Sequence, residues 1–149
     1  MRPTGGHQMR TLAILLIVAA GAANPPSTED ALVADVATAK FVETTTPNAP
    51  KGSQNALIGV DPNTKGPTAY GKTPAGTGLP AHWHSYPEYT VILAGKGTLV
   101  LDGKKHDVSP GSYLVIPAKM VHEFTCAPGV DCLLLIRRGG PTDYNFVKP

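Results

Sequence analysis

From Ala56 onward the chain consists of short apolar and β-branched runs that are separated by turns rich in Gly and Pro. The runs recur at a spacing of roughly eight to twelve residues, which is typical of a β-sandwich or barrel. We therefore predict an all-β fold. Because no internal repeat of the pattern is present, we expect a single barrel rather than a tandem pair. The predicted strands cover residues 56–60, 68–72, 81–84, 89–94, 97–101, 104–108, 113–116, 122–126 and 132–137.

The strongest turn signal is Asp102-Gly103, which lies between two of these runs. An Asp-Gly pair between alternating strands favours a two-residue hairpin with a type I′ turn. At 149 residues the chain is long enough for one domain with a substantial buried core. We assign residues 56–149 to the barrel and residues 24–55 to a linker and an irregular N-terminal arm, because those residues show no periodicity.

Residues 1–23 have the layout of a cleavable signal peptide. Arg2 and Arg10 precede an apolar run at 12–20, and Ala20-Gly21-Ala22 is a cleavage site, with residues 21–23 as the alternative. The apolar run is shorter than the ~20 residues that a spanning helix needs, which argues against a membrane anchor and stable membrane insertion. We expect a periplasmic or secreted protein. Met9 is an alternative start.

The net charge excludes one class of partner. Thirteen Lys and Arg, less the two in the leader, leave eleven against eleven Asp and Glu, so the mature chain is near neutral. It has no basic patch and no interleaving of aromatic and basic residues. Nucleic acid is therefore not an expected partner.

Cys126 and Cys132 are the only cysteines, and they flank a turn signal at Pro128-Gly129. Such a turn between two strands brings the cysteines near one another. In an oxidising compartment we expect a disulfide, and the alternative is a pair of free, half-buried thiols.

Residues that bind metal ions cluster in one run. His82 and His84 point to the same face of an extended strand, and the bend at Pro87 can return Glu88 towards them. His122 begins a later strand. Neutral nitrogen and anionic oxygen together suit a hard or borderline divalent ion.

The run from Gly76 to Gly95 reads G-x5-H-x-H-x3-E-x6-G and resembles, without a gap, the first motif of the cupin superfamily. The second motif aligns on Gly111, Pro117 and His122, with Lys119 where the pattern has Gly and Cys126 where it has Asn. Over about residues 40–149 the chain also resembles small exported single-domain cupins. The resemblance implies a double-stranded β-helix, that is, a jelly-roll barrel, which holds one divalent transition metal (Fe, Mn, Ni, Cu or Zn). It implies the ligands His82, His84, Glu88 and His122.

Other residues near the motifs have weaker assignments. Lys119 is a turn residue that either avoids or tolerates a left-handed conformation, and Trp83 and His106 are expected away from the metal. Arg137-Arg138 is interpreted as a solvated strand edge that discourages pairing with another sheet. The expected pocket residues, beside or near the ligands, are Tyr86, Tyr113, Met120 and Phe124.

Two hypotheses of function remain open. Resemblance to cupin dioxygenases implies a metal-dependent enzyme that cleaves a small organic substrate with dioxygen, in which Glu88 alternates between ligand and base. The alternative is a non-catalytic periplasmic cupin that binds or senses a small ligand or a metal. A bare barrel without metal is a further alternative for the site itself. Analogy with small cupins also suggests a homodimer.

Overall fold

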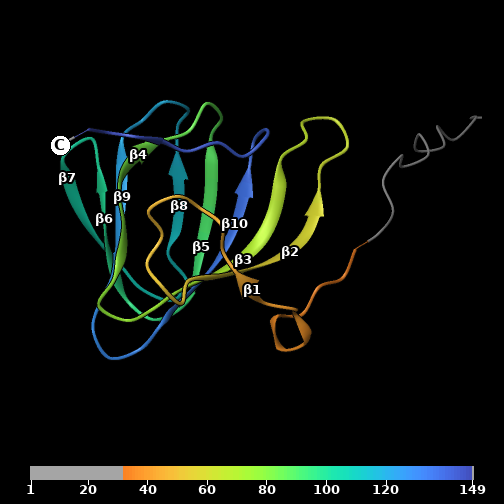
Figure 1. Ribbon diagram of the computed structural model, residues 1–149, viewed down its shortest axis with the longest axis horizontal. Coiled ribbons are helices and arrows are strands. Elements are labelled where there is room, and N and C mark those ends of the chain that lie inside the picture. The colour runs from red at the N-terminus through yellow and green to blue at the C-terminus, as the bar shows by residue number, and fades with distance from the viewer. Residues whose placement is uncertain (1–31, 149) are drawn as a thin grey trace, which may run out of the picture. The chain divides into compact units, whose positions relative to one another are not determined.

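The structure is a computed structural model that describes residues 32–148. In this region a short 3-10 helix, η1 (Val36–Thr38), precedes eleven strands, and the all-β prediction is confirmed. Figure 1 shows their arrangement. The strands are β1 (Val42–Glu43), β2 (Gln54–Val60), β3 (Pro67–Thr73), β4 (Gly78–Trp83), β5 (Glu88–Ala94), β6 (Gly97–Leu101), β7 (Lys104–Val108), β8 (Tyr113–Ile116), β9 (His122–Cys126), β10 (Cys132–Arg138) and β11 (Asn145–Phe146).

The strands form two antiparallel sheets, as a jelly roll requires. One sheet has the order β1-β2-β3-β10-β5-β8 and the other the order β11-β4-β9-β6-β7. From β7 onward the chain alternates between the sheets, so that β9 lies between β4 and β6 and β10 lies between β3 and β5 (Figure 1). This alternation places residues that are about forty positions apart in the sequence on neighbouring strands.

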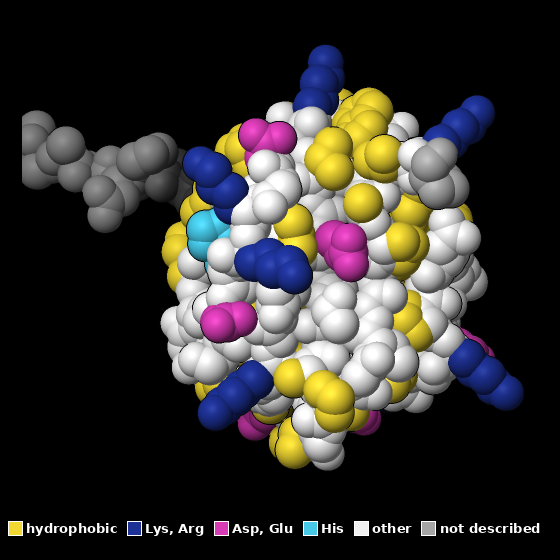
Figure 2. Space-filling model, turned by 90° about the vertical axis from the view of Figure 1, so that its left-hand side faces the viewer, with side chains coloured by type: hydrophobic (Ala, Val, Ile, Leu, Met, Phe, Trp, Pro, Cys, Tyr) yellow, Lys and Arg dark blue, Asp and Glu magenta, His cyan; other side chains and the backbone are white. Residues whose placement is uncertain are grey.

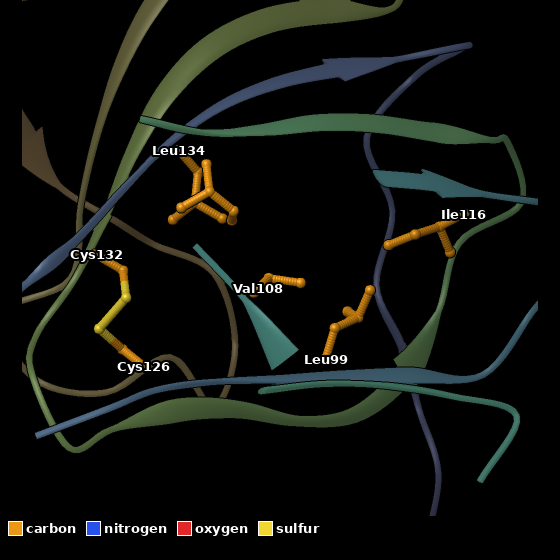
Figure 3. Packing of buried hydrophobic residues seen from close by; sticks show 7 residues of the cluster. Leu99, Val108, Ile116, Cys126, Cys132 and Leu134 are labelled. Atoms are coloured by element: carbon orange, nitrogen blue, oxygen red, sulfur yellow. A yellow bond between two sulfur atoms is a disulfide. The ribbon is translucent and has the colours of Figure 1, made fainter. Parts of the chain in front are cut away.

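The core lies between the two sheets. Alternate residues of each strand face inward, as in β5, where Glu88, Thr90 and Ile92 are buried between half-exposed neighbours. Figure 3 shows the buried apolar cluster, to which both sheets contribute. Its members are Ile92, Leu99, Val108, Ile116, Cys126, Cys132 and Leu134.

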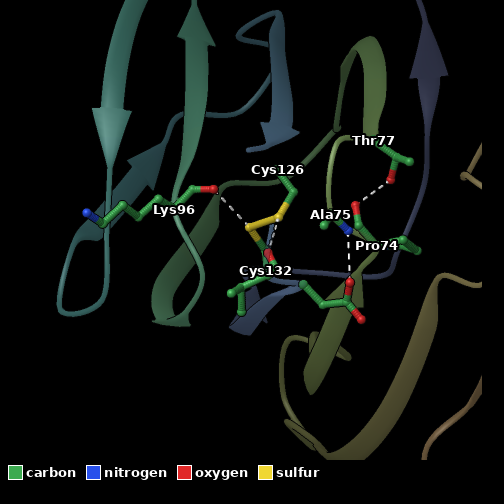
Figure 4. The surroundings of a disulfide bond; sticks show 8 residues. Pro74, Ala75, Thr77, Lys96, Cys126 and Cys132 are labelled. Carbon is green, nitrogen blue, oxygen red and sulfur yellow. Dashed lines mark hydrogen bonds between the residues drawn. A yellow bond between two sulfur atoms is a disulfide. The ribbon is translucent and has the colours of Figure 1, made fainter. Parts of the chain in front are cut away.

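The disulfide between Cys126 and Cys132 is part of this core, and both cysteines are fully buried. It joins the end of β9 to the start of β10 and so ties one sheet to the other (Figure 4). Asp131, next to it, accepts a hydrogen bond from the backbone N–H of Ala75 at 2.9 Å. Cys126 is the last residue of β9, whereas the turn before β9 precedes its first residue, His122. The disulfide therefore lies at the end of the barrel opposite that turn.

The hairpin at Asp102-Gly103 joins β6 to β7, and both turn residues have positive φ, as a type I′ turn demands. Figure 2 views the molecule from the side of these strands. On that face, acidic and basic side chains are scattered among neutral and apolar ones. In the described part of the chain, no helix is long and apolar enough to cross a membrane.

Several boundaries differ from the sequence-based expectation. The arm is not wholly irregular: β1 pairs with the start of β2, which begins at Gln54. The tail adds β11, which pairs with β4. β4 ends at Trp83, so that His84 follows the strand. β1 and β11 have two residues each, which is too short for an alternating pattern in the sequence. They are defined only by their hydrogen bonds to β2 and β4. The predicted signal peptide lies outside the described residues.

Candidate metal centre

Three histidines converge at one end of the barrel. His82 lies near the end of β4, His84 just after it, and His122 is the first residue of β9, directly opposite His82 in the sheet. The ring centres are 4.2 Å apart for His82 and His122, 4.8 Å for His82 and His84, and 5.0 Å for His84 and His122. All three side chains are buried, and one nitrogen of each lies within 4.8 Å of the others.

Backbone carbonyls determine which nitrogen of each ring carries a proton. Nδ1 of His82 lies 2.8 Å from the carbonyl oxygen of Pro80, Nδ1 of His122 lies 3.0 Å from that of Met120, and Nδ1 of His84 contacts that of Asp143. A carbonyl only accepts, so each Nδ1 donates and each neutral ring keeps a lone pair on Nε2. Histidine ligands of metal ions are oriented in this way in proteins.

Burial favours the neutral form of these rings. It lowers the pKa of His82 from its ordinary value to about 4, and the neighbouring His122 lowers it further. Burial also lowers the pKa of His122. Neutral imidazole is the form that binds a metal ion, so the site has its ligands ready at neutral pH.

The fourth expected ligand, Glu88, lies beside the cluster rather than within it. One carboxylate oxygen is 3.3 Å from Nε2 of His84, and that buried Nε2 has no hydrogen bond partner. With the proton on Nδ1, a lone pair of His84 faces a carboxylate oxygen, and a cation between them would satisfy both. The donor set therefore fits a divalent ion, held by His82, His84 and His122 with Glu88 adjacent.

Glu88 is instead engaged by Arg138, the last residue of β10. A guanidinium nitrogen lies 2.5 Å from the carboxylate, and the hydroxyl of Thr90 donates to the other oxygen at 2.7 Å. Burial by itself raises the pKa of Glu88, but Arg138 above all, and then the hydroxyl of Thr90, hold it well below its usual range. Glu88 is therefore ionised at neutral pH.

The interpretation of Arg137-Arg138 as a solvated edge is wrong for the second arginine. Arg138 is only 7% exposed, because it shares inward parity with Leu134 and Ile136 on β10. Arg137 points the other way and pairs with Asp61 at the surface. The alternation of side chains along a strand by itself predicts that Arg137 points outward and Arg138 inward.

A cavity of about 110 Å³ opens beside the histidines, between the two sheets. Its walls are mainly apolar, and its polar groups include His82, His122, Glu88, Thr90 and Arg138. The apolar part of the lining comprises Leu79, Leu99, Leu114, Ile116, Phe124, Leu134 and Ile136. Such a cavity suits a small organic molecule next to a metal ion.

Of the four expected pocket residues, only Phe124 lines this cavity. Tyr113 is 63% exposed, because its neighbours Leu114 and Ile116 take the inward positions of β8. Met120 packs behind the cavity against the core cluster. Tyr86 is exposed beside Gly140. For Tyr113 the reason is strand geometry: adjacent residues of a strand face opposite sides of the sheet, so a residue can be near the site in sequence and still point away from it.

The C-terminal tail contributes residues that the sequence did not assign to the site. Tyr144 lines the cavity, and its hydroxyl accepts a hydrogen bond from Arg138 at 3.2 Å. The carboxylate of Asp143 accepts hydrogen bonds from the backbone N–H and the hydroxyl of Ser85, while its carbonyl contacts His84. Asp143 thus clamps the segment that carries His84. The pairing of β11 with β4 holds the tail in place.

The turn before β9 also touches the site. Lys119 adopts a left-handed conformation with φ of 64°, so this residue takes the geometry usually given to glycine. Its backbone N–H donates to the carbonyl of His84 at 2.8 Å. The turn therefore fixes the backbone of a histidine of the cluster. Trp83 is half-buried and His106 exposed, and neither lines the cavity.

The comparisons with known proteins agree with this architecture. Residues 70–136 match the family model described as Cupin domain. The polyketide cyclase RemF of Streptomyces resistomycificus is similar in structure, with a TM-score of 0.65 and 21% identity over 78% of this chain and 85% of its own. No curated protein sequence matches the chain significantly.

Two further solved structures are similar. KdgF of Halomonas sp. has a TM-score of 0.60 and 15% identity, over 78% of this chain and 98% of its own. A predicted oxalate decarboxylase of Thermotoga maritima has a TM-score of 0.59 and 19% identity, over 72% of this chain and 97% of its own. Residues 70–136 therefore resemble a cupin domain, and the barrel that contains them has the same fold as these solved structures.

Proposed function

We propose that this protein is an exported, metal-dependent cupin enzyme that binds a small organic substrate beside a three-histidine metal ion. One observation carries the proposal: the Nε2 lone pairs of His82, His84 and His122 converge, each fixed by a backbone carbonyl, at a mainly apolar cavity. Three protein ligands leave coordination positions open for a substrate. The structural relatives include a named cyclase and a predicted decarboxylase, so the fold does not select the reaction.

When bound, a divalent ion supplies Lewis acidity, and iron or manganese also supplies redox chemistry with dioxygen. The dioxygenase-type reaction implied by the sequence resemblance is our first candidate. The apolar walls exclude water from the reacting molecule. The three histidines hold the ion, and Thr90 and Arg138 hold the carboxylate of Glu88 in place.

One observation favours a second candidate, a non-catalytic protein that binds a metal or a small ligand. A good general base has a pKa near the working pH, whereas the pKa of Glu88 is held well below its usual range while Arg138 contacts it. In that state Glu88 is a poor proton acceptor. Glu88 is the single carboxylate among the described residues that line the cavity, so this arrangement supports binding without turnover.

Export is part of the proposal. The expected leader at residues 1–23 supports it, and so does the disulfide between Cys126 and Cys132, because disulfides persist in oxidising compartments. Expression of the full chain in a bacterial host, followed by mass analysis of the periplasmic product, tests it. Loss of about the first 23 residues is expected. Retention of the whole chain in the cytoplasm contradicts export.

The metal proposal is tested by measuring the metal content of the exported protein purified without chelator. About one equivalent of metal is expected in the wild type, and much less in His84→Ala and His122→Ala. His106→Ala, an exposed histidine outside the cluster, is the matched control and keeps the metal. A wild type that holds no metal even after reconstitution contradicts the proposal.

The reaction is tested on protein loaded with iron or manganese. Oxygen consumption with enediol, flavonol or thiol substrates, with formation of a product, supports the enzyme. Tight reversible binding of a compound without turnover supports the second candidate instead.

A further inference from the structure

The charges that line the cavity do not balance once a metal ion is present. Glu88 and Arg138 are the charged side chains of the lining within the described residues, and they neutralise one another. The histidines are neutral. A divalent ion therefore leaves a surplus of two positive charges in a largely apolar cavity. Because a buried, uncompensated charge is costly, the loaded site favours an anionic ligand.

Arg138 has the position and the chemistry to receive such an anion. Its guanidinium is buried. Nη2 donates a hydrogen bond to the hydroxyl of Tyr144, whereas Nη1 forms an ion pair with Glu88 but makes no hydrogen bond within the described part of the chain. The planar fork of arginine matches the two oxygens of a carboxylate. Arg138 already holds one carboxylate in this structure, which shows that the geometry suits that group.

Arg138 also lines two adjoining hollows. A second, outer hollow of about 390 Å³ is lined by residues of β1, β2 and β3, and it shares Arg138, Ile136 and Tyr144 with the inner cavity. Arg138 therefore lies on the boundary between the outer hollow and the metal centre. Among the described residues, the charged side chains that line the outer hollow are Glu43 and Arg138, so Arg138 supplies its positive charge next to the metal centre.

We propose that the cavity binds a small organic carboxylate, whose carboxylate group replaces that of Glu88 on the guanidinium of Arg138. This inference rests on the proposed function and names its substrate class. The exchange is one carboxylate for another, so the charge on Arg138 stays balanced, and Glu88 is released next to the histidines. A short apolar body of the ligand packs on the wall formed by Leu114, Phe124 and Ile136. A phosphate group fits less well, because Arg138 is the single cationic side chain of this lining among residues 32–148.

The test uses butyrate as the probe and butyramide as its neutral isostere, and it measures binding by calorimetry and by ligand-observed NMR. Zinc-loaded protein is expected to bind butyrate at least about tenfold more tightly than butyramide. Arg138→Gln is expected to lose this preference. Arg137→Gln is the matched control and keeps it, because Arg137 pairs with Asp61 on the outer surface. Equal binding of both probes, or an unchanged preference in Arg138→Gln, overturns the proposal.

A second experiment needs no metal, so it separates this inference from the proposed function. In metal-free protein, Glu88 occupies the guanidinium and competes with any added anion. Glu88→Gln removes that competitor and is expected to bind butyrate about tenfold more tightly than the metal-free wild type. The double variant Glu88→Gln/Arg138→Gln removes both charges and is expected to lose the gain. If Glu88→Gln gains nothing, the proposal is wrong even where metal binding and turnover are established.

If the protein binds no metal but Glu88→Gln still gains affinity for butyrate, the proposed enzyme fails and the carboxylate site stands. Thermal unfolding of each variant verifies that it is folded. Arg138→Gln alone leaves the carboxylate of Glu88 buried without a counterion and can therefore fail to fold. The double variant leaves no unpaired buried charge, so the test can then be made with the double variant.

Discussion

The guanidinium of Arg138 lies 2.5 Å from the carboxylate of Glu88, and both side chains are buried at the wall of the histidine cluster. The pair joins the end of β10 to the start of β5, two neighbouring strands of the six-stranded sheet. Arg138 balances the negative charge of Glu88, so the carboxylate is buried inside a largely apolar barrel without an uncompensated charge. The same pair also keeps Glu88 from acting as a base while no other anion is present.

Removal of one partner of this pair is expected to cost more than removal of both. Arg138→Gln leaves a buried carboxylate without its counterion, and the expected loss in the free energy of unfolding is about 3 kcal/mol. Glu88→Gln/Arg138→Gln is expected to recover much of that loss. Urea denaturation of the metal-free proteins measures both. A single variant that is as stable as the double variant contradicts this account.

The metal-free protein is expected to lose stability as the pH falls from about 6.5 to about 4. The folded-state pKa of His82 is about 4, whereas an unfolded histidine binds a proton near 6.5, so acid favours the unfolded state in this window. The lowered pKa of His122 acts in the same direction. The measurement is urea denaturation at a series of pH values.

His82→Asn is expected to flatten that pH dependence, and His106→Asn, which replaces an exposed histidine, is expected to leave it unchanged. Equal slopes for His82→Asn and the wild type would show that burial of His82 does not produce the effect.

The clamp formed by Asp143 is expected to set metal affinity without binding the metal. Asp143→Ala removes the hydrogen bonds to Ser85 and so loosens the segment that carries His84. Loss of such a supporting contact typically weakens metal binding by about 10- to 100-fold. Competition with a chromophoric zinc chelator measures the affinity. Asp61→Ala removes similar hydrogen bonds, from the backbone N–H groups of Asn63 and Thr64, and does not touch the segment that carries His84. It is the control and should bind zinc like the wild type.

The disulfide is expected to contribute stability by limiting the unfolded chain. Cys126 and Cys132 are six residues apart, and a loop of that size corresponds to about 2 kcal/mol in the chain-entropy model. The double variant Cys126→Ala/Cys132→Ala is expected to lose at least that much, since it also removes two buried sulfur atoms. Denaturant unfolding measures the difference, and a variant as stable as the wild type contradicts it.

Lys119 is expected to be a position where glycine improves the protein. Its φ of 64° strains an L-residue by about 1 kcal/mol, which glycine avoids at a smaller entropic cost. Lys119→Gly should raise the free energy of unfolding by up to about 1 kcal/mol. Lys105→Gly, in strand β7, should lower it by a similar amount because its backbone is extended. A loss of stability in both variants would show that the side chain of Lys119 makes a contact that matters.

Much of the strand pattern was predictable from local sequence. The strands β6, β7, β8 and β9 begin and end at the predicted residues, because each is bounded by Gly, Pro or Asp-Gly signals. Their inward and outward faces follow from the period of two. The errors arose at the pocket, where Tyr113 was expected to line the cavity although its strand turns its side chain outward.

The spacing of the histidines by itself determined that His82, His84 and His122 were candidates for one metal site, and the turn between the cysteines determined that they were candidates for a bridge. Only the tertiary structure decided that Arg138 and Tyr144 belong to the same site, and that Glu88 faces Arg138 as well as His84. The physical reason is the range of the interactions. Turns and strand parity are local, whereas the partner of a buried charge is chosen by sheet pairing between segments that are fifty residues apart, as β5 and β10 are.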